Sequence, residues 1–321
     1  MTTASPLSST GGSLGLHAVD YLLRKYPSYT VILLVRDAAE SDEHTNKLHQ
    51  ILKRHPKTAA SIHQVDLSSL PSVHAFVDTI VAGVRRQKYP PLASIVCTAY
   101  YWNLVADSEV TANGFDKTLE VNHIAHAALI LRLLGSFGAT GRIIHISSDS
   151  HWPGKNNMET YLPFIPDDPA QLLTPSTDHD KYGRGYQRYA ISKLVLTTWD
   201  PKLGKVTAIA MNPGNMVDSR ALRRNTPTSL HRKQKFMFKP LQPLLSLIDL
   251  TLRVAALAGA DVIELALNSK FASKTGFFTL LMQDESSPES NDEVKQELIW
   301  TKTLEWARIT EENRALQNAF D

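Results

Sequence analysis

Short continuous apolar runs alternate along the chain with segments in which apolar residues recur at helical spacing. The run 29–35, for example, reads YTVILLV. The pattern predicts strands at 29–35, 61–65, 92–98, 142–147, 206–211 and 276–281, and helices at 41–55, 71–86, 114–134, 186–199, within 242–268 and at 292–309. Strands that are apolar on both faces and separated by helices are typical of a parallel sheet covered on both sides. We therefore expect an α/β fold with a doubly wound parallel sheet in three α/β/α layers.

The chain is expected to form a single domain over residues 1–321, because it has no internal repeat and no linker-like stretch. Two segments interrupt the alternation of strands and helices. Residues 149–188 are rich in Pro, Gly, Asp and Asn, and loops of this length are often functional. We expect an inserted loop or lid that covers the substrate, with apolar side chains from Trp152, Tyr161 and Phe164. Residues 220–240 are expected to form a substrate-side loop.

Composition and charge restrict the compartment and the partners. With 43% hydrophobic and 21% charged residues the chain is ordinary for a globular protein, and a net charge of +2 gives no reason to propose nucleic acid. Residues 1–6 lack the basic start and apolar run of a signal peptide. Four charged residues interrupt the apolar stretch 240–268, which argues against a membrane span. We therefore expect a cytoplasmic protein without an integral membrane span.

Cysteine and histidine residues give little sign of a metal site. The single cysteine, Cys97, excludes an internal disulfide and lies in an apolar run, which favours a buried structural thiol. His123 and His126 share one helix face, but no cluster of Cys, Asp or Glu accompanies them at zinc-like spacing. No metal is expected.

The most informative pentapeptide is Tyr-Ala-Ile-Ser-Lys at 189–193. Tyr189 and Lys193 lie four positions apart and share a helix face. The lysine ammonium is expected to lower the pKa of the tyrosine, which is about 10 in a free side chain. Ser148, which follows the strand at 142–147, can hold the oxygen of a carbonyl or alcohol while Tyr189 moves the proton. The spacing alone is weak evidence, since Tyr21 and Lys25 repeat it.

Polar and glycine residues follow several of the predicted strands directly, and in such folds the ligand lies beyond the carboxyl ends of the strands. These residues are Arg36, Asp66, Thr98, Ser148, Pro213 and Gly214. We expect them to meet at one edge of the sheet, and this coincidence is stronger evidence for a site than any single motif.

The segment 114–116 (GFD) leads to 120–126 (EVNHIAH), and with the residues above the chain resembles the short-chain dehydrogenase/reductase family. It is most similar to the retinol-dehydrogenase-like and protochlorophyllide-reductase-like branch, over about residues 8–315. The resemblance implies a Rossmann-type fold and an NADP(H)-dependent oxidoreductase. It also implies that Asn122 holds a water linking the lysine to a proton relay, Ser148 orients the substrate oxygen, Tyr189 is the acid/base and Lys193 binds the nicotinamide ribose.

The same resemblance implies a set of cofactor contacts. Asp66 would bind the adenine, Pro213 and Gly214 would approach the nicotinamide with Ser219 as a hydroxyl partner, and Arg36 would bind the 2′-phosphate. The remaining implied contacts are Gly12, Ser13, Leu14 and Gly15 in the phosphate loop, Thr98, and the shared residues Asn122, Tyr189 and Lys193. Each assignment has an alternative: Asp66 as a helix-capping residue, Arg36 as a surface partner of Asp37, and the loop as a plain Gly/Ser-rich leader.

Departures from the family pattern gather at the N-terminal end. With Gly15 as the last glycine of the loop, Ser13 and Ser9 stand where the other two belong, although Gly11 and Gly12 serve if the loop is shortened. The first strand should fall within residues 1–8, yet Pro6 lies there and a central strand tolerates proline poorly. We therefore expect an incomplete or replaced first strand.

Two more departures lie near the expected site. At the end of the strand at 92–98, Cys97, Thr98, Ala99 and Tyr100 stand where the family has Asn-Asn-Ala-Gly, so the alanine is kept and the asparagines and the glycine are lost. The aromatic residues 100–102 either shape a pocket for a bulky apolar substrate or pack beneath the loop. The helix that carries Tyr189 meets Pro201 and must end by Asp200, which shortens it and weakens a homodimer contact.

Two functions remain in view. The first is an NADP(H)-dependent oxidoreductase that reduces a carbonyl, or oxidises a secondary alcohol, on an apolar small molecule, as a tailoring ketoreductase of secondary metabolism would. The alternative is a catalytically impaired dinucleotide-binding scaffold or interaction protein. The altered glycine loop and first strand favour the alternative, whereas the retention of all four catalytic residue types favours the enzyme.

Overall fold

Eight strands form one sheet in the computed structural model, which describes residues 4–8, 12–175, 179–198 and 206–313. Their order across the sheet is β10-β9-β6-β5-β4-β1-β2-β3. The strands are β1 (Ala4–Ser8), β2 (Thr30–Val35), β3 (Ala60–Gln64), β4 (Leu92–Cys97), β5 (Phe137–Ile146), β6 (Val206–Asn212), β9 (Gly276–Thr279) and β10 (Met282–Gln283). Neighbouring strands pair in parallel except β9 and β10. The predicted doubly wound parallel sheet is confirmed.

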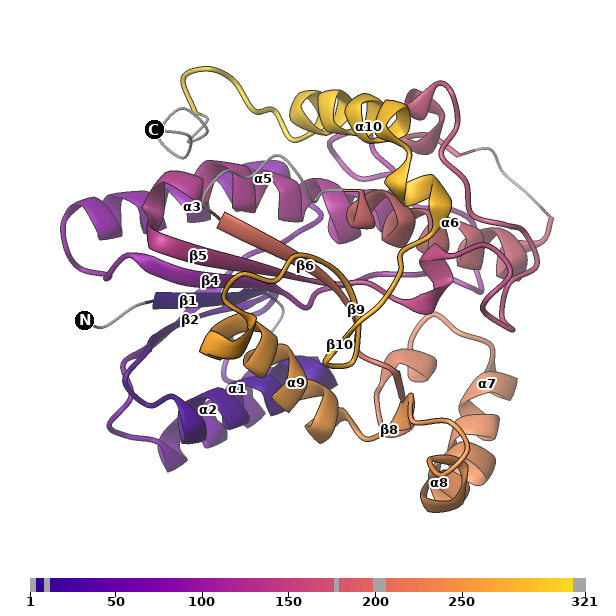
Figure 1. Ribbon diagram of the computed structural model, residues 1–321, viewed down its shortest axis with the longest axis horizontal. Helices are drawn as coiled ribbons and strands as arrows, with labels where there is room; N and C mark the ends of the chain where they lie inside the picture. Colours follow the sequence, from indigo (N-terminus) through magenta and orange to yellow (C-terminus); the bar gives the residue numbers. More distant parts are fainter. Residues whose placement is uncertain (1–3, 9–11, 176–178, 199–205, 314–321) are drawn as a thin grey trace.

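Helices cover both faces of the sheet (Figure 1). On one face lie α1 (Ser13–Lys25), α2 (Glu43–Arg54) and α9 (Ala255–Leu267). On the other lie α3 (Leu70–Arg85), α5 (Ala125–Leu133), α6 (Lys181–Thr197) and α10 (Glu293–Trp306). Each layer buries its own apolar cluster against the strands. Helix α9 approaches α1 closely at Gly259, where an added Cβ would lie 2.7 Å from the backbone nitrogen of Ala18. The three-layer arrangement is therefore as predicted.

The first strand forms in spite of its proline. β1 lies between β2 and β4 and pairs with β2 in continuous register from Ala4 to Leu7. Its register toward β4 shifts between Ala4 and Leu7, the interval that holds Pro6. A proline has no N–H to donate, so the irregularity falls where a ladder bond is missing. The strand is five residues long and continues only to Ser8, and Ser9 and Gly11 of the expected phosphate loop lie outside the described residues.

Several helix boundaries differ from the predictions. The helix predicted at 114–134 begins at Lys117 and runs through α4 (Lys117–Leu119) and a π-helical turn, η1 (Glu120–Ile124), into α5. Helix α6 begins at Lys181 rather than 186, because the carboxylate of Asp180 caps it by accepting from the backbone N–H of Gly183 at 2.8 Å. It ends at Thr197, before Pro201, and reaches a length of 17 residues because residues 181–185 extend it at its N-terminal end.

The two segments that interrupt the alternation contain more structure than their composition indicates. Within 149–188 lie η3 (Asp149–His151) and η4 (Pro169–Leu172), and the last eight residues belong to α6. The segment 220–240 is largely helical. It contains η5 (Ala221–Arg223), α7 (Thr228–Lys233) and η6 (Gln234–Phe238) and runs into α8 (Lys239–Leu245). Figure 1 shows α7 and α8 as a unit that projects beyond the sheet.

The remaining elements are short. A second, two-stranded sheet pairs β7 (Asn215–Met216) with β8 (Leu252–Arg253) in parallel. The other short turns are η2 (Leu134–Ser136), η7 (Ser269–Phe271) and η8 (Pro288–Asn291). None of the helices in the described part combines the length and apolar character needed to span a bilayer.

Candidate active site

The strand order indicates that a ligand would bind at the edge of the sheet formed by the carboxyl ends of the parallel strands. From the centre, β1 continues to β2 and β3 on one side, and β4 continues to β5 and β6 on the other. Ligands of doubly wound sheets bind beyond the carboxyl ends of the strands where the order reverses, which here is between β1 and β4. The predicted residues that follow β2, β3, β4, β5 and β6 all lie at this edge.

Tyr189 lies on α6 in an aromatic environment. Its ring centroid is 5.1 Å from that of Trp102 and 6.1 Å from that of Tyr100. Burial raises the pKa of Tyr189, and Tyr100 adds to the rise, while a hydrogen bond with Ser148 opposes it. The expectation that Lys193 lowers the pKa of Tyr189 is therefore wrong for this state of the protein.

Lys193 supplies the physical reason. Its side chain is only 2% exposed, and its Nζ donates a hydrogen bond to the carbonyl oxygen of Ile146 at 2.6 Å. The Nζ lies 5.6 Å from the ring centroid of Tyr189, one helical turn away as predicted. Burial lowers the pKa of Lys193 to about 7, because the charged ammonium has lost its water. The lysine is thus only partly charged near neutral pH and attracts the phenolate less than a solvated ammonium would.

Ser148 faces this pair from the end of β5. Its backbone is extended and its hydroxyl caps η3, accepting from the backbone N–H of Ser150 at 3.2 Å. The same hydroxyl donates to Asp149 Oδ1 at 2.8 Å. The neighbouring Ser147 is buried and bonded to Thr197 Oγ1 at 3.0 Å. Of the two serines, Ser148 is therefore the one beside Tyr189.

Asn122 lies in the π-helical turn and holds the site together. Its side chain accepts from the backbone N–H of Tyr101 at 2.6 Å and donates to the carbonyl of Tyr101 at 2.9 Å. It also donates to Ser192 Oγ on α6 at 2.9 Å. These bonds use both amide hydrogens, so Asn122 fixes the loop after β4 relative to the helix of Tyr189. The backbone carbonyl oxygen of Asn122 lies 3.2 Å from His126 Nδ1.

The aromatic residues 100–102 after β4 were expected either to shape a substrate pocket or to pack beneath the loop, and they differ in which they do. Trp102 is 8% exposed, whereas Tyr100 is 40% exposed beside Tyr189. The hydroxyl of Tyr101 instead donates to Glu109 Oε1, and the Nζ of Lys117 lies 4.8 Å from the centroid of the Tyr101 ring. The apolar cluster around Tyr189 consists of Trp102, Leu104, Tyr186 and Ala190, packed against Met158, Tyr182, Tyr189, Ala221, Leu222 and Leu230. The inserted segment and the 220–240 segment thus both contribute apolar walls.

The described part of the phosphate loop lies at the N-terminus of α1. Gly12 is the N-cap residue; among the described residues no side chain caps the helix, and its first turn holds no acidic residue. Leu14 and Gly15 are buried. A helix end of this kind offers backbone N–H groups to an anion, so it fits the pyrophosphate of a dinucleotide.

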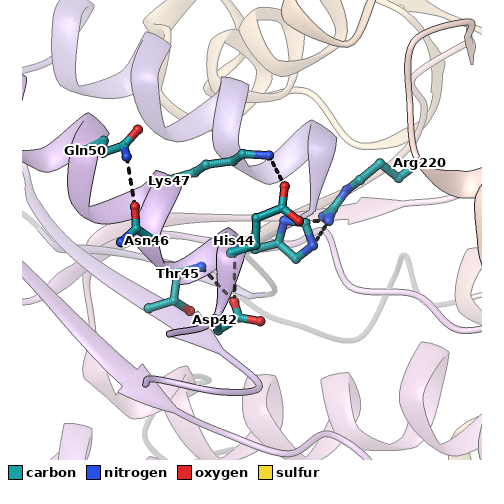
Figure 2. A network of polar contacts seen from close by, with 8 residues as sticks. Asp42, His44, Thr45, Asn46, Lys47, Gln50 and Arg220 are labelled. Carbon is teal, nitrogen blue, oxygen red and sulfur yellow. Dashed lines mark hydrogen bonds and ion pairs between the residues drawn. The ribbon is translucent and has the colours of Figure 1, made fainter. Parts of the chain in front are cut away.

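Arg220 links this region to the substrate side. Its backbone N–H donates to Ser13 Oγ at 3.2 Å, and its guanidinium contacts the ring of His44 at the start of α2. Figure 2 shows this contact beside Asp42, which caps α2 by accepting from the backbone N–H groups of His44 and Thr45. Burial lowers the pKa of Arg220 and that of His44. Arg220 therefore lies next to the phosphate loop, and the lowered pKa of His44 keeps its ring neutral near pH 7.

Arg36 and Asp66 lie at the ends of β2 and β3, and both are exposed. Asp37 accepts from the backbone N–H of Ala39 at 2.9 Å and, within the described residues, forms no ion pair with Arg36. Asp66 Oδ1 accepts from the backbone N–H and hydroxyl of Ser68. The N-cap of α3 is Ser69 rather than Asp66. The described structure therefore contains neither the ion pair of Arg36 with Asp37 nor Asp66 as the N-cap of α3, which were the two alternative roles.

Residues after β4 and β6 complete the edge. Thr98 is 7% exposed, and Pro213 is buried. Gly214 has φ +82°, and an added Cβ would lie 2.6 Å from the carbonyl oxygen of Thr251, so the turn requires glycine. Ser219 is 6% exposed, and its hydroxyl accepts from the backbone N–H of Ala221 at 3.2 Å. These residues follow strands that end at the same edge of the sheet as β5, which carries Ser148.

Three buried histidines lie behind the site. His123 bonds Thr303 Oγ1 at 2.8 Å, and burial lowers its pKa to about 3. Burial likewise lowers the pKa of His126 to about 4 and that of His145 well below its usual value. In the described part of the chain no group of three or more His, Cys, Asp or Glu side chains is placed to hold a metal.

We expect these histidines to make the fold sensitive to acid. Each is neutral when folded and has an ordinary pKa of 6.5 when unfolded, so stability is complete above about pH 6.5 and falls as the pH drops toward their folded pKa values. Three protons bound only by the unfolded chain lower the free energy of unfolding by about 4 kcal/mol per pH unit near pH 5. Urea unfolding at pH 7 and pH 5 measures this loss.

A matched pair of variants assigns the acid effect. His123→Gln should reduce the pH dependence of the free energy of unfolding by about 1.4 kcal/mol per pH unit near pH 5, whereas His179→Gln, at an exposed position, should leave it unchanged. If His123→Gln leaves the pH dependence of the free energy of unfolding unaltered, other groups cause the acid sensitivity.

Sequence reasoning missed several residues at this edge. Arg220 and His44 are 176 positions apart and were not expected to meet. Met158, Leu222 and Leu230 pack against the same apolar cluster as Tyr189, from segments whose composition indicated loops. No local motif marks these five residues, because only the tertiary fold brings them to the site. The Asp ahead of α6 was a usable signal for its start.

Comparison with known proteins identifies the family and supports the fold. Residues 220–316 match the AcuH dehydrogenase domain family. Dehydrogenase acuH of Aspergillus aculeatus is 50% identical over 92 residues, covering 29% of this chain and 94% of that protein. Short-chain dehydrogenase iccH of Talaromyces variabilis is 24% identical over 94% of this chain and 95% of its own length. A solved NADPH-bound carbonyl reductase from chicken fatty liver superimposes with a TM-score of 0.56 at 16% identity, covering 89% of this chain and all of that one. The chain belongs to the short-chain dehydrogenase/reductase family of oxidoreductases.

Proposed function

We propose that the protein is an NADP(H)-dependent oxidoreductase that reduces a carbonyl, or oxidises a secondary alcohol, on an apolar small molecule. The observation that carries the proposal is the convergence of Ser148, Tyr189 and Lys193, from β5 and α6, at the sheet edge where ligands of this fold bind. The bound dinucleotide would supply the hydride, and the protein supplies position and charge.

Ser148 and Tyr189 act on the substrate oxygen. The hydroxyl of Ser148 orients the carbonyl, and Tyr189 gives its proton to the oxygen as the carbonyl is reduced. The raised pKa of Tyr189 keeps the phenol protonated at neutral pH, which is the form that a proton donor needs. Lys193, next to this ring, binds the ribose of the cofactor, and Asn122 holds the loop and helix that carry the pair.

The cofactor would lie across the carboxyl edge. The N-terminus of α1, with Gly12, Ser13, Leu14 and Gly15, binds the pyrophosphate. Arg36 binds the 2′-phosphate and Asp66 the adenine. Thr98, Pro213, Gly214 and Ser219 line the nicotinamide end. The named NADPH-bound carbonyl reductase, which shares the fold, supports this choice of cofactor.

The walls around Tyr189 favour an apolar substrate. Trp102 contacts the ring of Tyr189, and Met158 and Leu230 pack against the same apolar cluster. Segment 149–188 acts as the lid and 220–240 as the substrate-side segment of the single domain. A tailoring ketoreductase in a cytoplasmic pathway of secondary metabolism would have such a site. The shorter C-terminal end of α6 weakens any homodimer through that helix.

Reduction of apolar ketones by NADPH deuterated at C4 tests the proposal. The alcohol product should carry the deuterium, and product should match NADPH consumed one for one. Binding of NADPH without deuterium transfer to any member of a broad ketone and aldehyde panel would favour the second candidate.

That second candidate is a catalytically impaired dinucleotide-binding scaffold. One observation favours it: Arg220 bonds Ser13 and contacts His44, so the 220–240 segment lies against the altered phosphate loop. A scaffold would bind the dinucleotide but show no turnover that depends on Tyr189. The enzyme would lose nearly all of its turnover when Tyr189 is replaced.

Arg36→Ser tests the cofactor preference. Loss of a charge-assisted contact to a phosphate costs about 1.5–3 kcal/mol, so NADPH should bind roughly 10- to 100-fold more weakly. NADH binding should be unchanged, since NADH lacks the 2′-phosphate. Arg54→Ser is the control, because Arg54 is exposed at the far end of α2. Equal weakening of both dinucleotides would mean that Arg36 does not read the 2′-phosphate.

A further inference from the structure

The region from 220 to 250 differs in charge from the rest of the molecule. It contains seven Lys and Arg residues and one acidic residue, Asp249, for a net charge of +6. The remainder holds 27 basic and 31 acidic residues and is therefore net −4. Six of the seven basic side chains are exposed, namely Arg223, Arg224, Arg232, Lys233, Lys235 and Lys239. This positive charge is concentrated on α7, η6, α8 and the turn before them.

The same region exposes an unusual amount of apolar surface. Seven of the fifteen exposed large apolar side chains in the described chain lie within 236–250. They are Phe236 (70% exposed), Met237, Leu241, Leu244, Leu247 (81%), Ile248 (89%) and Leu250. Exposed apolar side chains concentrated in one short segment indicate an interaction site. These apolar side chains and the six exposed basic ones are called the docking surface below.

A pocket lies within the basic part of this surface. It has a volume of about 240 Å³ and is lined by Val217, Arg223, His231, Gln234, Lys235 and Lys239. Three cationic side chains and no carboxylate face it. Within the described residues, the Nδ1 atom of His231 is buried and makes no hydrogen bond. The pocket is therefore suited to a phosphate group.

We propose that this surface docks the protein on an anionic lipid bilayer, with Leu247 and Ile248 entering the acyl boundary and the basic pocket receiving a lipid phosphate. Helices with apolar residues beside Lys and Arg lie in the membrane interface in this way, held by apolar burial and by attraction to anionic lipids. Helices α7 and α8 project from the body of the protein, so they can reach a flat surface (Figure 1).

Charge argues against a second copy as the occupant. A two-fold interface places the same surface on both sides, which would bring one +6 region against another. An anionic bilayer complements both the apolar and the basic parts of the surface. The proposal does not depend on the dinucleotide chemistry, but it has a consequence for it: Leu230 of α7 packs in the cluster around Tyr189, so docking would place the apolar walls of the site near the membrane.

Vesicle sedimentation with the full, cofactor-free chain tests the proposal. The protein should bind vesicles of phosphatidylcholine with about one third phosphatidylserine, bind phosphatidylcholine alone weakly, and dissociate as salt rises from about 0.1 to 0.5 M. Lys235→Gln with Lys239→Gln should weaken binding about 30-fold. Leu247→Gln with Ile248→Gln should weaken it at least about tenfold.

Matched controls lie on other elements. Val294→Gln on α10 removes an equally exposed apolar side chain, and Lys53→Gln with Lys57→Gln removes two exposed charges, so both should bind like wild type. Circular dichroism checks that each variant is folded. No binding to anionic vesicles, equal binding to neutral ones, or a dimer in solution that Ile248→Gln dissolves would each overturn the proposal.

Discussion

Replacing Tyr189 by Phe is expected to lower kcat for carbonyl reduction by roughly 10²- to 10⁴-fold, the usual contribution of a positioned proton donor. The substitution removes only the hydroxyl, and the ring keeps its contacts with Trp102 and Tyr100. NADPH should therefore bind with nearly unchanged affinity. Steady-state kinetics and a fluorescence titration of the same sample separate the two effects.

Tyr182→Phe is the matched control, since Tyr182 lies on the same helix and packs against the same apolar cluster. It should leave kcat within about twofold, because surface hydroxyls away from the chemistry contribute little. If Tyr189→Phe retains substantial activity, or if both variants lose it equally, the role assigned to Tyr189 is wrong.

Replacing Lys193 by Met is expected to abolish turnover and, at neutral pH, to stabilise the fold. Lys193 has a pKa of about 7 when folded against an ordinary 10.5, so the unfolded chain binds the proton more tightly. At pH 7.5 this difference costs about 4 kcal/mol of stability. Methionine avoids that cost but leaves the carbonyl of Ile146 without its donor, at about 1–3 kcal/mol. The net gain should be about 2 kcal/mol.

The sign of this effect should depend on pH. A depressed lysine pKa means that the wild type gains stability as the pH rises from about 7 toward 10.5, by about 1.4 kcal/mol per pH unit. The variant lacks this gain, so it should be more stable than wild type at pH 7.5 and less stable at pH 10. Urea unfolding at both values measures the difference, and Lys181→Met, exposed on the same helix, should show neither effect. A difference that does not vary with pH would contradict the buried, weakly charged state of Lys193.

The sheet and the edge that carries the site could be predicted from local patterns. Apolar runs such as 29–35 marked strands, and the residues directly after them had to meet because parallel strands end at one edge. β1 was harder to predict, since Pro6 weakens its local signal and only pairing with β2 and β4 forms it. The family was also within reach, because the motif around Asn122 and the Tyr189–Lys193 pair are local.

The electrostatics of the site could not be read from the sequence. Four-residue spacing places Lys193 beside Tyr189, but it does not show that β5 buries the ammonium against Ile146 and so weakens its charge. Arg220 begins the segment predicted to form a substrate-side loop, yet its guanidinium reaches His44 across the fold. Burial and contacts between distant segments decide both cases, and neither leaves a local signal.

Titration of the purified protein with NADPH, with NADH beside it, tests the central claim most directly. Energy transfer from protein tryptophan to the bound cofactor reports binding without any substrate. Saturable binding that is tighter for NADPH would show that the N-terminus of α1 and Arg36 hold the dinucleotide, as proposed. No binding of either cofactor to a folded sample would contradict the hydride-transfer function for this chain.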